Sequence, residues 1–304
     1  MRVLITGAAG TLGRALIPVL ATRGHTIRGL DVRPGQSFSK TEWMVGDVRE
    51  ADIVSAACAD VDVIVHGAAL HGIHLETHAP RDFYELNVTG TFNVWSAAVE
   101  RGVRGLIFSS SMGVYGESRQ PVSDTGVAFV REDMPLRPTD VYGWTKVVGE
   151  ELCRYHYREH GIPSLALRFG MFVPEPYFRC GIRLLYGGLH EDDAAGSVLA
   201  GIDALERGAV THAALNVESP LPFTTEDAAD LRTDPLPALE RHWPGSAELL
   251  RSRGVRSLKP IQEIFPVSNL SDALNFRPSH DFGQWLGELA SRPDERVHAD
   301  PPWP

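Results

Sequence analysis

The first thirteen residues constrain the fold of this chain more than any other stretch. Residues 3–5 are an apolar run without polar alternation, which is typical of a strand buried on both faces of a parallel sheet. Gly7, Gly10 and Gly13 follow at three-residue steps, and apolar residues then recur at helical spacing over 12–20. The pattern predicts a strand, a tight turn and a helix.

Such a unit is suited to binding a diphosphate. Gly7 permits the turn, Gly10 lets the backbone approach the phosphates, and Gly13 lets the helix pack against the strand. The free N–H groups at the start of the helix, at Thr11 and Leu12, would then face the phosphates.

The second predicted strand, residues 26–30, ends at Asp31, eighteen residues after Gly13. A carboxylate at this place accepts hydrogen bonds from an adenosine ribose. It also repels a 2′-phosphate, so the sequence favours NAD over NADP. Arg14 and Arg33 lie close enough in sequence to weaken that preference.

The first half of the chain alternates strands and helices. Further strands are predicted at 43–45, 61–65 and 106–108, a helix over 81–101 ends at Gly102, and a last strand is predicted at 213–217. This alternation predicts an α/β fold, a doubly wound parallel sheet of the Rossmann type, whose ligands lie at the carboxyl ends of the strands. The residues that follow those strands should therefore converge, including His66-Gly-Ala-Ala69 and Ser109-Ser-Ser111.

The second half differs in composition, because prolines break it into short pieces from residue 220 onward. We predict a dinucleotide-binding domain over 1–174, completed by the strand at 213–217. Residues 175–304 would be mainly a smaller substrate-binding region and a tail. Short helices are predicted at 227–231, 236–243, 247–253 and 282–289, and an extended tail at 296–304, where Trp303 could dock.

Charge and cysteine content exclude several function classes. A net charge of -10 and a pI near 5.6 argue against a nucleic-acid partner or an anionic membrane surface. No apolar run is long enough to span a bilayer, and no signal-peptide pattern precedes the first strand. Cys58, Cys153 and Cys180 form no CxxC pair, so we expect a cytoplasmic protein without a disulfide framework or zinc site. The expected partner is a small-molecule substrate.

Three histidines, His71, His74 and His78, were weighed as metal ligands. His74 and His78 would share one face of a helix, but no glutamate follows His74 and the segment is predicted as a loop. Lining of a pocket or contact with solvent is favoured, and no metal is expected.

The chemistry is predicted at Tyr142 and Lys146, which open a helix and share one of its faces. A free tyrosine has a pKa of about 10, so it needs electrostatic help to act as a base at neutral pH. The charge of Lys146, with that of an oxidised nicotinamide, favours the phenolate.

Together these motifs resemble the extended short-chain dehydrogenase/reductase superfamily, in its NAD-dependent epimerase/dehydratase branch. The resemblance covers roughly residues 1–200 and rests on these segments of the sequence: Gly7-Ala-Ala-Gly-Thr-Leu-Gly13, Asp31, Gly46-Asp47-Val48, His66-Gly-Ala-Ala69, Asn87, Ser109-Ser-Ser-Met-Gly-Val-Tyr-Gly116, Tyr142-Gly-Trp-Thr-Lys146 and Leu167-Arg-Phe-Gly-Met-Phe-Val-Pro174.

The resemblance implies roles for particular residues. Tyr142 would be the catalytic base or acid, Lys146 would hold the nicotinamide ribose and tune the tyrosine, and Ser111 would hydrogen-bond the reacting oxygen. Asp47 and Val48 would flank the adenine. The implied cofactor is NAD, and the remaining implied cofactor residues are Ala68, Ala69 and Asn87.

Departures from the family pattern narrow the reaction. Dehydratases carry an acidic pair directly after the position that matches Ser111, whereas this chain has Met112 and Gly113, so dehydration by that route is not expected. Only residues 175–189 stand where nucleotide-sugar epimerases have several dozen nucleotide-binding residues, and Met171 replaces a usual asparagine.

The shortened stretch resembles bacterial uronate dehydrogenases, which oxidise a free sugar acid. In those enzymes an arginine follows the matching Pro-Glu-Pro and binds the carboxylate. Arg179 is the first candidate for that arginine here and Arg183 the second, while Met112 and Met171 are candidates for contact with the substrate.

The sequence therefore predicts an NAD-dependent oxidoreductase that removes hydride from a secondary alcohol or hemiacetal carbon of a small sugar-like or sugar-acid substrate. An epimerase would use the same residues and return the hydride to the opposite face. A non-catalytic NAD-sensing protein of this fold is a further alternative, although such proteins typically lose the tyrosine or the lysine. A homodimer through the helices around 81–101 and 142–160 would suit the family.

Overall fold

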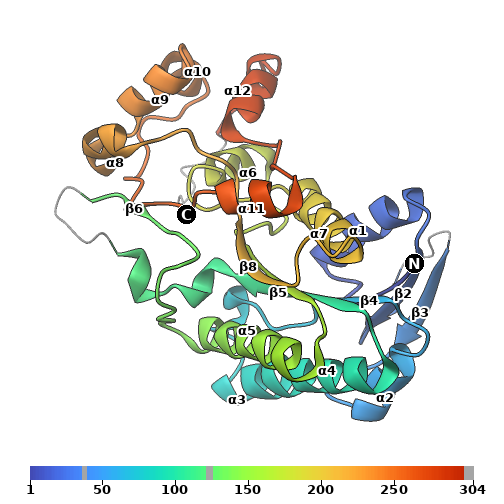
Figure 1. Cartoon of the computed structure of the whole chain (residues 1–304). Coiled ribbons are helices and arrows are strands. Elements are labelled where there is room, and N and C mark those ends of the chain that lie inside the picture. The colour runs from blue at the N-terminus through green and yellow to red at the C-terminus, as the bar shows by residue number, and fades with distance from the viewer. Residues whose placement is uncertain (36–39, 121–125, 298–304) are drawn as a thin grey trace.

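The computed structural model describes residues 1–35, 40–120 and 126–297 and contains a seven-stranded parallel sheet (Figure 1). The strand order is β3-β2-β1-β4-β5-β7-β8. The strands are β1 (Arg2–Thr6), β2 (Thr26–Asp31), β3 (Thr41–Val45), β4 (Val63–His66), β5 (Gly105–Ser111), β7 (Ser164–Phe169) and β8 (His212–Val217). The predicted doubly wound α/β fold is confirmed.

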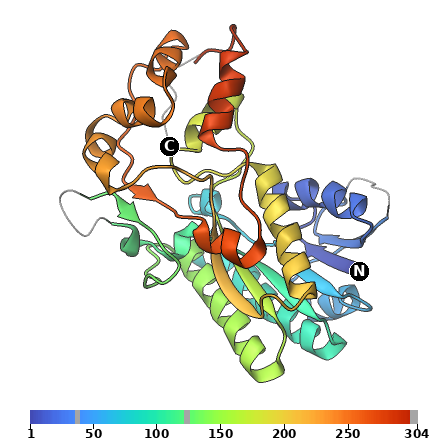
Figure 2. The ribbon, with the colours of Figure 1, turned by 45° about the horizontal axis from the view of Figure 1, so that its top comes forward.

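Helices cover both faces of this sheet, as Figures 1 and 2 show. One face is covered by α1 (Thr11–Thr22), α7 (Glu191–Glu206) and α11 (Ser268–Leu274), whose apolar side chains share a core with β1, β7 and β8. The other face is covered by α2 (Ala51–Ala57), α4 (Gly90–Arg101) and α5 (Val141–His160). All seven residues of β5 are buried, as expected for a central strand with helices on both sides.

The helix predicted over 81–101 is interrupted. A short α3 (Pro80–Phe83) leads into a π-helical stretch, η2 (Tyr84–Thr89), before α4 begins. A π-helical turn is rare and is found mostly at functional sites, since the wider turn changes the direction in which side chains project. Here the buried side chain on that turn is Asn87.

The resemblance implied a strand over residues 167–173, but the observed strand stops before the end of that range. β7 ends at Phe169, and the chain continues through Gly170 to Met171, which forms an isolated bridge with Gly188. The next long helix, α7, was not predicted, although it packs against α1 and carries Ala194 and Ala195 into the core. Part of the chain beyond residue 175 therefore belongs to the layers of the main sheet.

A separate group of short helices packs around its own apolar core beyond the carboxyl ends of β7 and β8, at the top of Figure 1. It consists of α6 (Tyr177–Arg183), α8 (Ala228–Thr233), α9 (Leu236–His242), α10 (Ser246–Ser252) and α12 (Phe282–Ala290). The four short helices predicted here are confirmed within one or two residues at most ends.

A small two-stranded sheet, β6 (Ala128–Phe129) with β9 (Glu263–Ile264), joins this group to the main body. Most of the tail predicted at 296–304, including Trp303, lies outside the described residues. Within the described ranges, no helix is both long enough and apolar enough to cross a membrane.

Candidate active site

The glycine turn after β1 has the geometry that the sequence predicted. Gly7 has φ +70° and donates its N–H to the Leu30 carbonyl at 2.9 Å. A Cβ on Gly7 would lie 2.7 Å from the Ala68 nitrogen, and one on Gly13 would lie 2.2 Å from the Ala8 carbonyl oxygen. Backbone segments therefore approach here as only glycine allows.

The N-terminus of α1 begins at Thr11 and has Gly10 as its capping residue, with no side chain accepting from the first turn. The N–H groups of that turn are positioned to bind an anion, since the helix dipole adds to their attraction. The turn and helix together fit the diphosphate of a dinucleotide.

Asp31 connects the end of β2 to this turn. Its side chain is buried, and its Oδ2 accepts from the Ala9 N–H at 3.0 Å, while its Oδ1 accepts from the Arg33 N–H at 3.0 Å. The Arg33 guanidinium is exposed and lies 3.5 Å from the same Oδ1, and Arg14 donates to the Ala9 carbonyl at 2.9 Å. Both arginines thus lie beside the carboxylate that is predicted to bind ribose.

The residues at the end of β4 are held by a chain of buried hydrogen bonds. The His66 ring lies 2.7 Å from Thr6 Oγ1 through Nδ1 and 2.9 Å from Thr91 Oγ1 through Nε2. Thr6 Oγ1 also accepts from the Ala68 N–H at 3.3 Å. Burial, and to a smaller degree the charge of Lys146, lowers the pKa of His66 to about 3, so its imidazole is neutral at pH 7.

Asn87 is fully engaged with the protein. Its Nδ2 donates to the Leu70 carbonyl at 2.9 Å and to Thr145 Oγ1 at 3.0 Å, and its Oδ1 accepts from the Leu70 N–H at 2.8 Å. It therefore connects the segment after β4 to α5. Its place at the cofactor stays a prediction, and the contacts observed are with Leu70, which directly follows Ala68 and Ala69, and with Thr145.

Asp47 and Val48 follow β3. Hydrogen bonds from the Arg49 guanidinium, of which the shortest is 2.6 Å, lower the pKa of Asp47. Val48 is 3% exposed and packs on α4, where a Cβ on Gly90 would lie 2.7 Å from its Cγ2. Val48 is thus fixed as an apolar wall, and Asp47 is held as an ion pair.

Ser111, Tyr142 and Lys146 come together as predicted. β5 ends at Ser111, whose Oγ accepts from the Gly113 N–H at 3.1 Å in the 3-10 turn η3 (Met112–Val114). A Cβ on Gly143 would lie 2.5 Å from the Gly113 carbonyl oxygen, so the start of α5 packs directly on that turn. This close approach places the Tyr142 ring beside Ser111, since a Cβ on Gly113 would lie 3.4 Å from Ser111 Oγ and 3.8 Å from Tyr142 Cδ1.

Burial disfavours the charged forms of both residues on α5. Burial lowers the pKa of Lys146 to about 7. It raises the pKa of Tyr142 to about 12, although the interaction with Ser111 acts in the opposite direction. Lys146 Nζ donates to the Ser109 carbonyl at 2.8 Å and lies 5.7 Å from the centre of the Tyr142 ring. A proton on Lys146 would therefore stabilise a tyrosinate at the half-buried Tyr142.

His71 reaches the same place. Its ring centre lies 6.1 Å from that of Tyr142. Desolvation by the surrounding protein is the larger cause, and the charge of Lys146 the smaller one, that lowers the pKa of His71 to about 3. The His71 side chain nevertheless remains accessible to solvent. The lining role favoured for this histidine fits its position, where the imidazole is neutral.

The described histidines that come within reach of one shared ion are His190 and His280, together with Asp192, rather than the set from 71 to 78. Their rings stack at 4.2 Å with an angle of 16° between the planes. Nearly parallel rings direct their nitrogen lone pairs side by side, whereas two ligands of one tetrahedral ion must point to a common centre. The stacking of His190 on His280 therefore does not favour a shared ion.

The predicted substrate residues lie at two places. Met171 is 38% exposed and joins the segment after α6, donating its N–H to the Gly187 carbonyl at 2.9 Å. The end of Met112 reaches the same segment, since a Cβ on Gly187 would lie 2.8 Å from Met112 Cε. The Met112 side chain and the Met171 backbone thus both contact Gly187, and Met112 directly follows Ser111.

The two candidate arginines share a single carboxylate. Arg179 Nε lies 2.9 Å from Glu175 Oε1, and Arg183 Nη2 donates to the same oxygen at 2.6 Å. Glu175, which no sequence motif indicated, pairs with both arginines, and one carboxylate against two guanidinium groups leaves one net positive charge.

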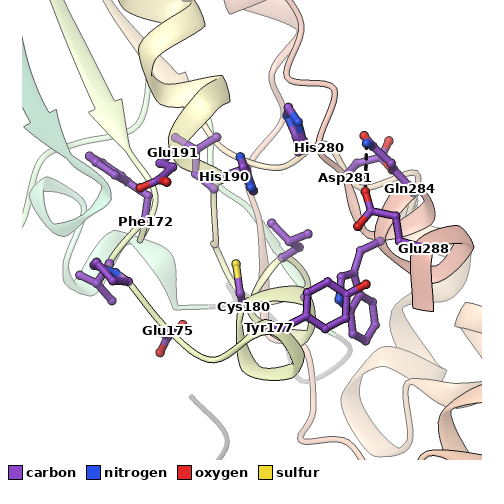
Figure 3. A pocket seen from close by; sticks show the side chains of 16 residues that line it. Phe172, Glu175, Tyr177, Cys180, His190, Glu191, His280, Asp281, Gln284 and Glu288 are labelled. Carbon is purple, nitrogen blue, oxygen red and sulfur yellow. Dashed lines mark hydrogen bonds between the residues drawn. The ribbon is translucent and has the colours of Figure 1, made fainter. Parts of the chain in front are cut away.

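A pocket of about 410 Å³ opens between α6, α12 and the start of α7 (Figure 3). Figure 3 shows Tyr177 and Cys180 of α6 on one side and His280, Gln284 and Glu288 on the other. None of Ser111, Tyr142 and Lys146 lines this pocket. It is therefore separate from the catalytic group, and no sequence motif indicated it.

The site combines a glycine turn after β1, an acid at the end of β2, a serine at the end of β5, and a tyrosine and a lysine at the start of α5. Together these features define an NAD-dependent enzyme of the extended short-chain dehydrogenase/reductase class. The chain belongs to the NAD dependent epimerase/dehydratase family, whose pattern matches residues 3–173. The cofactor is NAD.

Similar proteins agree with this assignment. Uronate dehydrogenase of Pseudomonas syringae pv. tomato is 31% identical over 216 residues, covering 66% of this chain and 74% of the relative. L-arabinose 1-dehydrogenase (NAD(P)(+)) of Haloferax volcanii is 32% identical, covering 57% of this chain and 67% of the relative.

Two solved structures share the fold over nearly the whole chain. A UDP-galactose 4-epimerase has a TM-score of 0.68 and 25% identity, and the match covers 96% of this chain and 99% of the other. A uronate dehydrogenase from Agrobacterium tumefaciens has a TM-score of 0.68 and 22% identity, covering 99% and 91%.

Proposed function

We propose that this enzyme is a dehydrogenase that removes hydride from a secondary alcohol or hemiacetal carbon of a small sugar-like or sugar-acid substrate. The observation that carries the proposal is the grouping of Ser111, Tyr142 and the buried Lys146 at the end of β5 and the start of α5. NAD, when bound, supplies the hydride acceptor.

In the proposed reaction Ser111 hydrogen-bonds the substrate oxygen and Tyr142, as tyrosinate, accepts the hydroxyl proton. The C–H electron pair leaves as hydride while the O–H electron pair becomes the second bond of a carbonyl group. Lys146 favours the ionised form of Tyr142 and holds the nicotinamide ribose. The chain contributes placement and electrostatics.

Small substrate size is supported by the short connection between β7 and α7. Residues 175–189 contain only the seven-residue α6 and tight turns, and Met171 is bridged to Gly188. Two of the similar proteins are described as dehydrogenases of free sugars or sugar acids, a uronate and L-arabinose.

Epimerisation is the second candidate. UDP-glucose 4-epimerase of Lactobacillus helveticus is 30% identical over 56% of this chain. An epimerase would use Ser111 and Tyr142 in the same way but would return the hydride, leaving no net NADH. A purely NAD-sensing role is disfavoured, because the tyrosine and lysine are both retained and correctly placed.

We further propose that the chain acts as a cytoplasmic homodimer. Large apolar side chains are exposed along the outer side of η2, α4 and α5, with Phe92 53%, Trp144 44% and Tyr155 52% exposed. Tyr84 stacks on Trp144 at 6.4 Å, which extends this surface. Burial of such a surface by a second copy would be favourable. Free, unpaired cysteines suit a reducing compartment.

We also propose that residues 1–174 with β8 form the NAD-binding part and that the short helices from 175 onward shape the substrate side, while α7 lies in the layers of the main sheet.

The test is NADH absorbance with purified protein, NAD and a panel of free sugars, uronic acids and nucleotide sugars. Net NADH from a free sugar or sugar acid supports the dehydrogenase. An isomerised sugar without NADH identifies an epimerase instead. The catalytic assignment is wrong if Tyr142→Phe leaves turnover intact.

A further inference from the structure

A buried ion pair that the proposed reaction does not use joins β7 to α5. Arg168 on β7 donates from Nε to Glu150 Oε1 at 2.9 Å and from Nη2 to Glu150 Oε2 at 2.7 Å, so both carboxylate oxygens are engaged. Both side chains are buried. Replacing the two partners of such a pair by apolar residues is often neutral or stabilising, so stability alone does not account for the pair.

Glu150 lies one helical turn after Lys146 on α5 and also reaches β5. Ser110 Oγ donates to Glu150 Oε1 at 2.6 Å. Ser110 stands between Ser109 and Ser111 in the strand. The Ser109 carbonyl is the group that accepts from Lys146 Nζ, at 2.8 Å. The carboxylate is therefore attached to the part of β5 that carries both the anchor of the lysine and the serine proposed to bind the substrate oxygen.

Arg168 extends this connection to the turn after Ser111. It lies opposite Ser110 in the register of β5 and β7, and its Nη1 donates to the Tyr115 hydroxyl at 2.8 Å. Tyr115 directly follows η3, and its N–H donates to the Met112 carbonyl at 3.2 Å. The ion pair thus holds the strand before Ser111 and the turn after it.

The helix runs very close to the strand next to this ion pair. A Cβ on Gly149 would lie 2.1 Å from Phe108 Cζ, so a larger residue at 149 would push α5 away from β5. The Phe108 ring also lies near Lys146, whose Nζ is 5.0 Å from the ring centre. The depth at which α5 sits on β5 therefore sets the position of Lys146 and, one turn before it, that of Tyr142.

We propose that Glu150 and Arg168 are positioning residues for the reaction of Tyr142. By holding α5 against β5 and against the turn after Ser111, they keep Lys146 on its anchor and the tyrosine beside the serine. The expected effect on turnover rests on the proposed dehydrogenase function, whereas the placement of Lys146 can be measured without it.

Arg168 also decides which group the Lys146 ammonium meets. Residues four apart share a helix face, where a carboxylate and an ammonium attract each other. Here the guanidinium engages both oxygens of Glu150, and Lys146 Nζ donates to the Ser109 carbonyl instead. A glutamate without the arginine would compete for the ammonium and draw it away from the Tyr142 ring.

The first experiment replaces both partners by apolar residues, Glu150→Leu together with Arg168→Met. No charge is left unpaired, so the double variant should unfold at about the wild-type temperature. Because Tyr142 and Ser111 lose their alignment, kcat should fall by ~tenfold or more. The rise of kcat/KM with pH should also move to higher pH, since Lys146 no longer lies beside the phenol. A stable double variant with wild-type kcat and pH profile overturns the proposal.

Ser110→Ala is a milder variant that changes no charge. It removes only the hydrogen bond that β5 donates to Glu150 and leaves the ion pair in place. Turnover should fall in the same direction, by about three- to tenfold, which is the range of one hydrogen bond. If the double variant does not fold, wild-type kcat and pH profile in Ser110→Ala overturn the proposal.

A crystal structure of the double variant, or of Ser110→Ala if the double variant does not fold, gives a readout that needs no turnover. The distance from Lys146 Nζ to the Ser109 carbonyl oxygen is 2.8 Å in the wild type and should lengthen beyond hydrogen-bond distance. An unchanged distance overturns the proposal. If the wild-type enzyme forms no NADH from any compound, the proposed function fails, and this distance still decides the positioning role.

The matched control is Arg28→Met together with Glu42→Gln. Arg28 on β2 is also buried and donates from Nε to Glu42 Oε2 at 3.0 Å, but its other bonds go to the carbonyls of Ala57 and Ala59 at the end of α2. The control should keep kcat within about threefold of wild type and an unshifted pH profile, even if it unfolds at a lower temperature. A control that loses as much kcat as Glu150→Leu with Arg168→Met would show that the loss of any buried ion pair has this effect, and the proposal would then fail.

Discussion

The ammonium nitrogen of Lys146 lies 5.7 Å from the centre of the Tyr142 ring and is anchored by the Ser109 carbonyl at 2.8 Å. One turn of α5 separates the two residues, so the helix itself fixes their relation. The anchor comes from β5, the strand that also carries Ser111. Helix and strand therefore position the base, its cation and the hydrogen-bond donor together.

Tyr142→Phe should lower kcat by about 10²–10⁴-fold, the range that a positioned acid–base group contributes. The aromatic ring stays in place, so the binding of NAD should change little. Steady-state NADH formation and NAD titration by tryptophan fluorescence check the two parts separately. Weakened NAD binding with unchanged kcat would assign Tyr142 to the cofactor alone.

Lys146→Met should shift the pH dependence of oxidation. Burial raises the pKa of Tyr142 to about 12, and only the tyrosinate accepts the substrate proton, so kcat/KM rises with pH. The two groups titrate as a coupled pair in which a tyrosinate favours the proton on Lys146, so Lys146→Met removes a charge that favours the tyrosinate and moves the rise to higher pH. A pH–rate profile of both proteins tests this, and coincident profiles would mean that Lys146 does not tune the tyrosine.

Much of this site follows from local sequence patterns. The glycine spacing after β1, Asp31 at the end of β2 and the tyrosine–lysine step on α5 each lie within one strand–turn–helix unit or one helical turn. Their geometry is set by neighbours in sequence, so spacing alone predicts it. Ser111 could be placed because the ends of parallel strands meet at one edge of a sheet.

The parts that could not be predicted depend on contacts between distant segments. Glu218, which directly follows β8, lies against Gly170 because β8 pairs with β7 and Gly170 leaves room for its carboxyl group. The expected carboxylate-binding role of Arg179 did not take into account Glu175, which pairs with it across one helical turn. The π-helical turn at Asn87 likewise has no signal in apolar periodicity.

His66 should make the free energy of unfolding depend on pH in the acid range. Its pKa is about 3 in the folded state and about 6.5 when unfolded. Between these values the unfolded chain binds the extra proton, so stability contributed by neutral His66 is complete above pH 6.5 and is lost as the pH falls toward 3. The loss should be on the order of a few kcal/mol.

Chemical denaturation at several pH values measures this loss. His66→Gln is the control, because glutamine does not titrate and can still bond to Thr6 and Thr91. Its unfolding free energy should fall less between pH 6.5 and 4 than that of wild type. Equal slopes would show that other groups account for the acid instability.

Asp31→Asn should reduce the preference for NAD over NADP by ~tenfold or more, which corresponds to about 1.4 kcal/mol. The change removes the charge that repels a 2′-phosphate, while the exposed Arg33 and the neighbouring Arg14 remain. The ratio of kcat/KM for the two cofactors is the measurement. Arg33→Ala in the Asp31→Asn background should reverse most of the gain in relative NADP activity. An unchanged ratio would mean that Arg33 does not contribute to the choice of cofactor.

Gly143→Ala should impair catalysis although position 143 carries no reacting group. A Cβ there would lie 2.5 Å from the Gly113 carbonyl oxygen, and this contact is with backbone that cannot rotate away. The start of α5 must then move from the turn that follows Ser111, which separates Tyr142 from the serine. Overpacking of this kind costs typically 1–3 kcal/mol. Displacement of reacting groups by about 1 Å can cost about 10²-fold in rate.

Gly287→Ala in α12 is the matched control, because a Cβ at Gly287 meets nothing within 4 Å and alanine favours a helix over glycine by about 1 kcal/mol. We expect the control to keep wild-type kcat and to unfold at a slightly higher temperature. Gly143→Ala should lose kcat by ~tenfold or more and unfold at a lower temperature. A Gly143→Ala variant that unfolds at a lower temperature but keeps full kcat would contradict this prediction. The close approach of α5 to the turn after Ser111 would then serve stability alone, because Ser111 and Tyr142 would stay aligned without it.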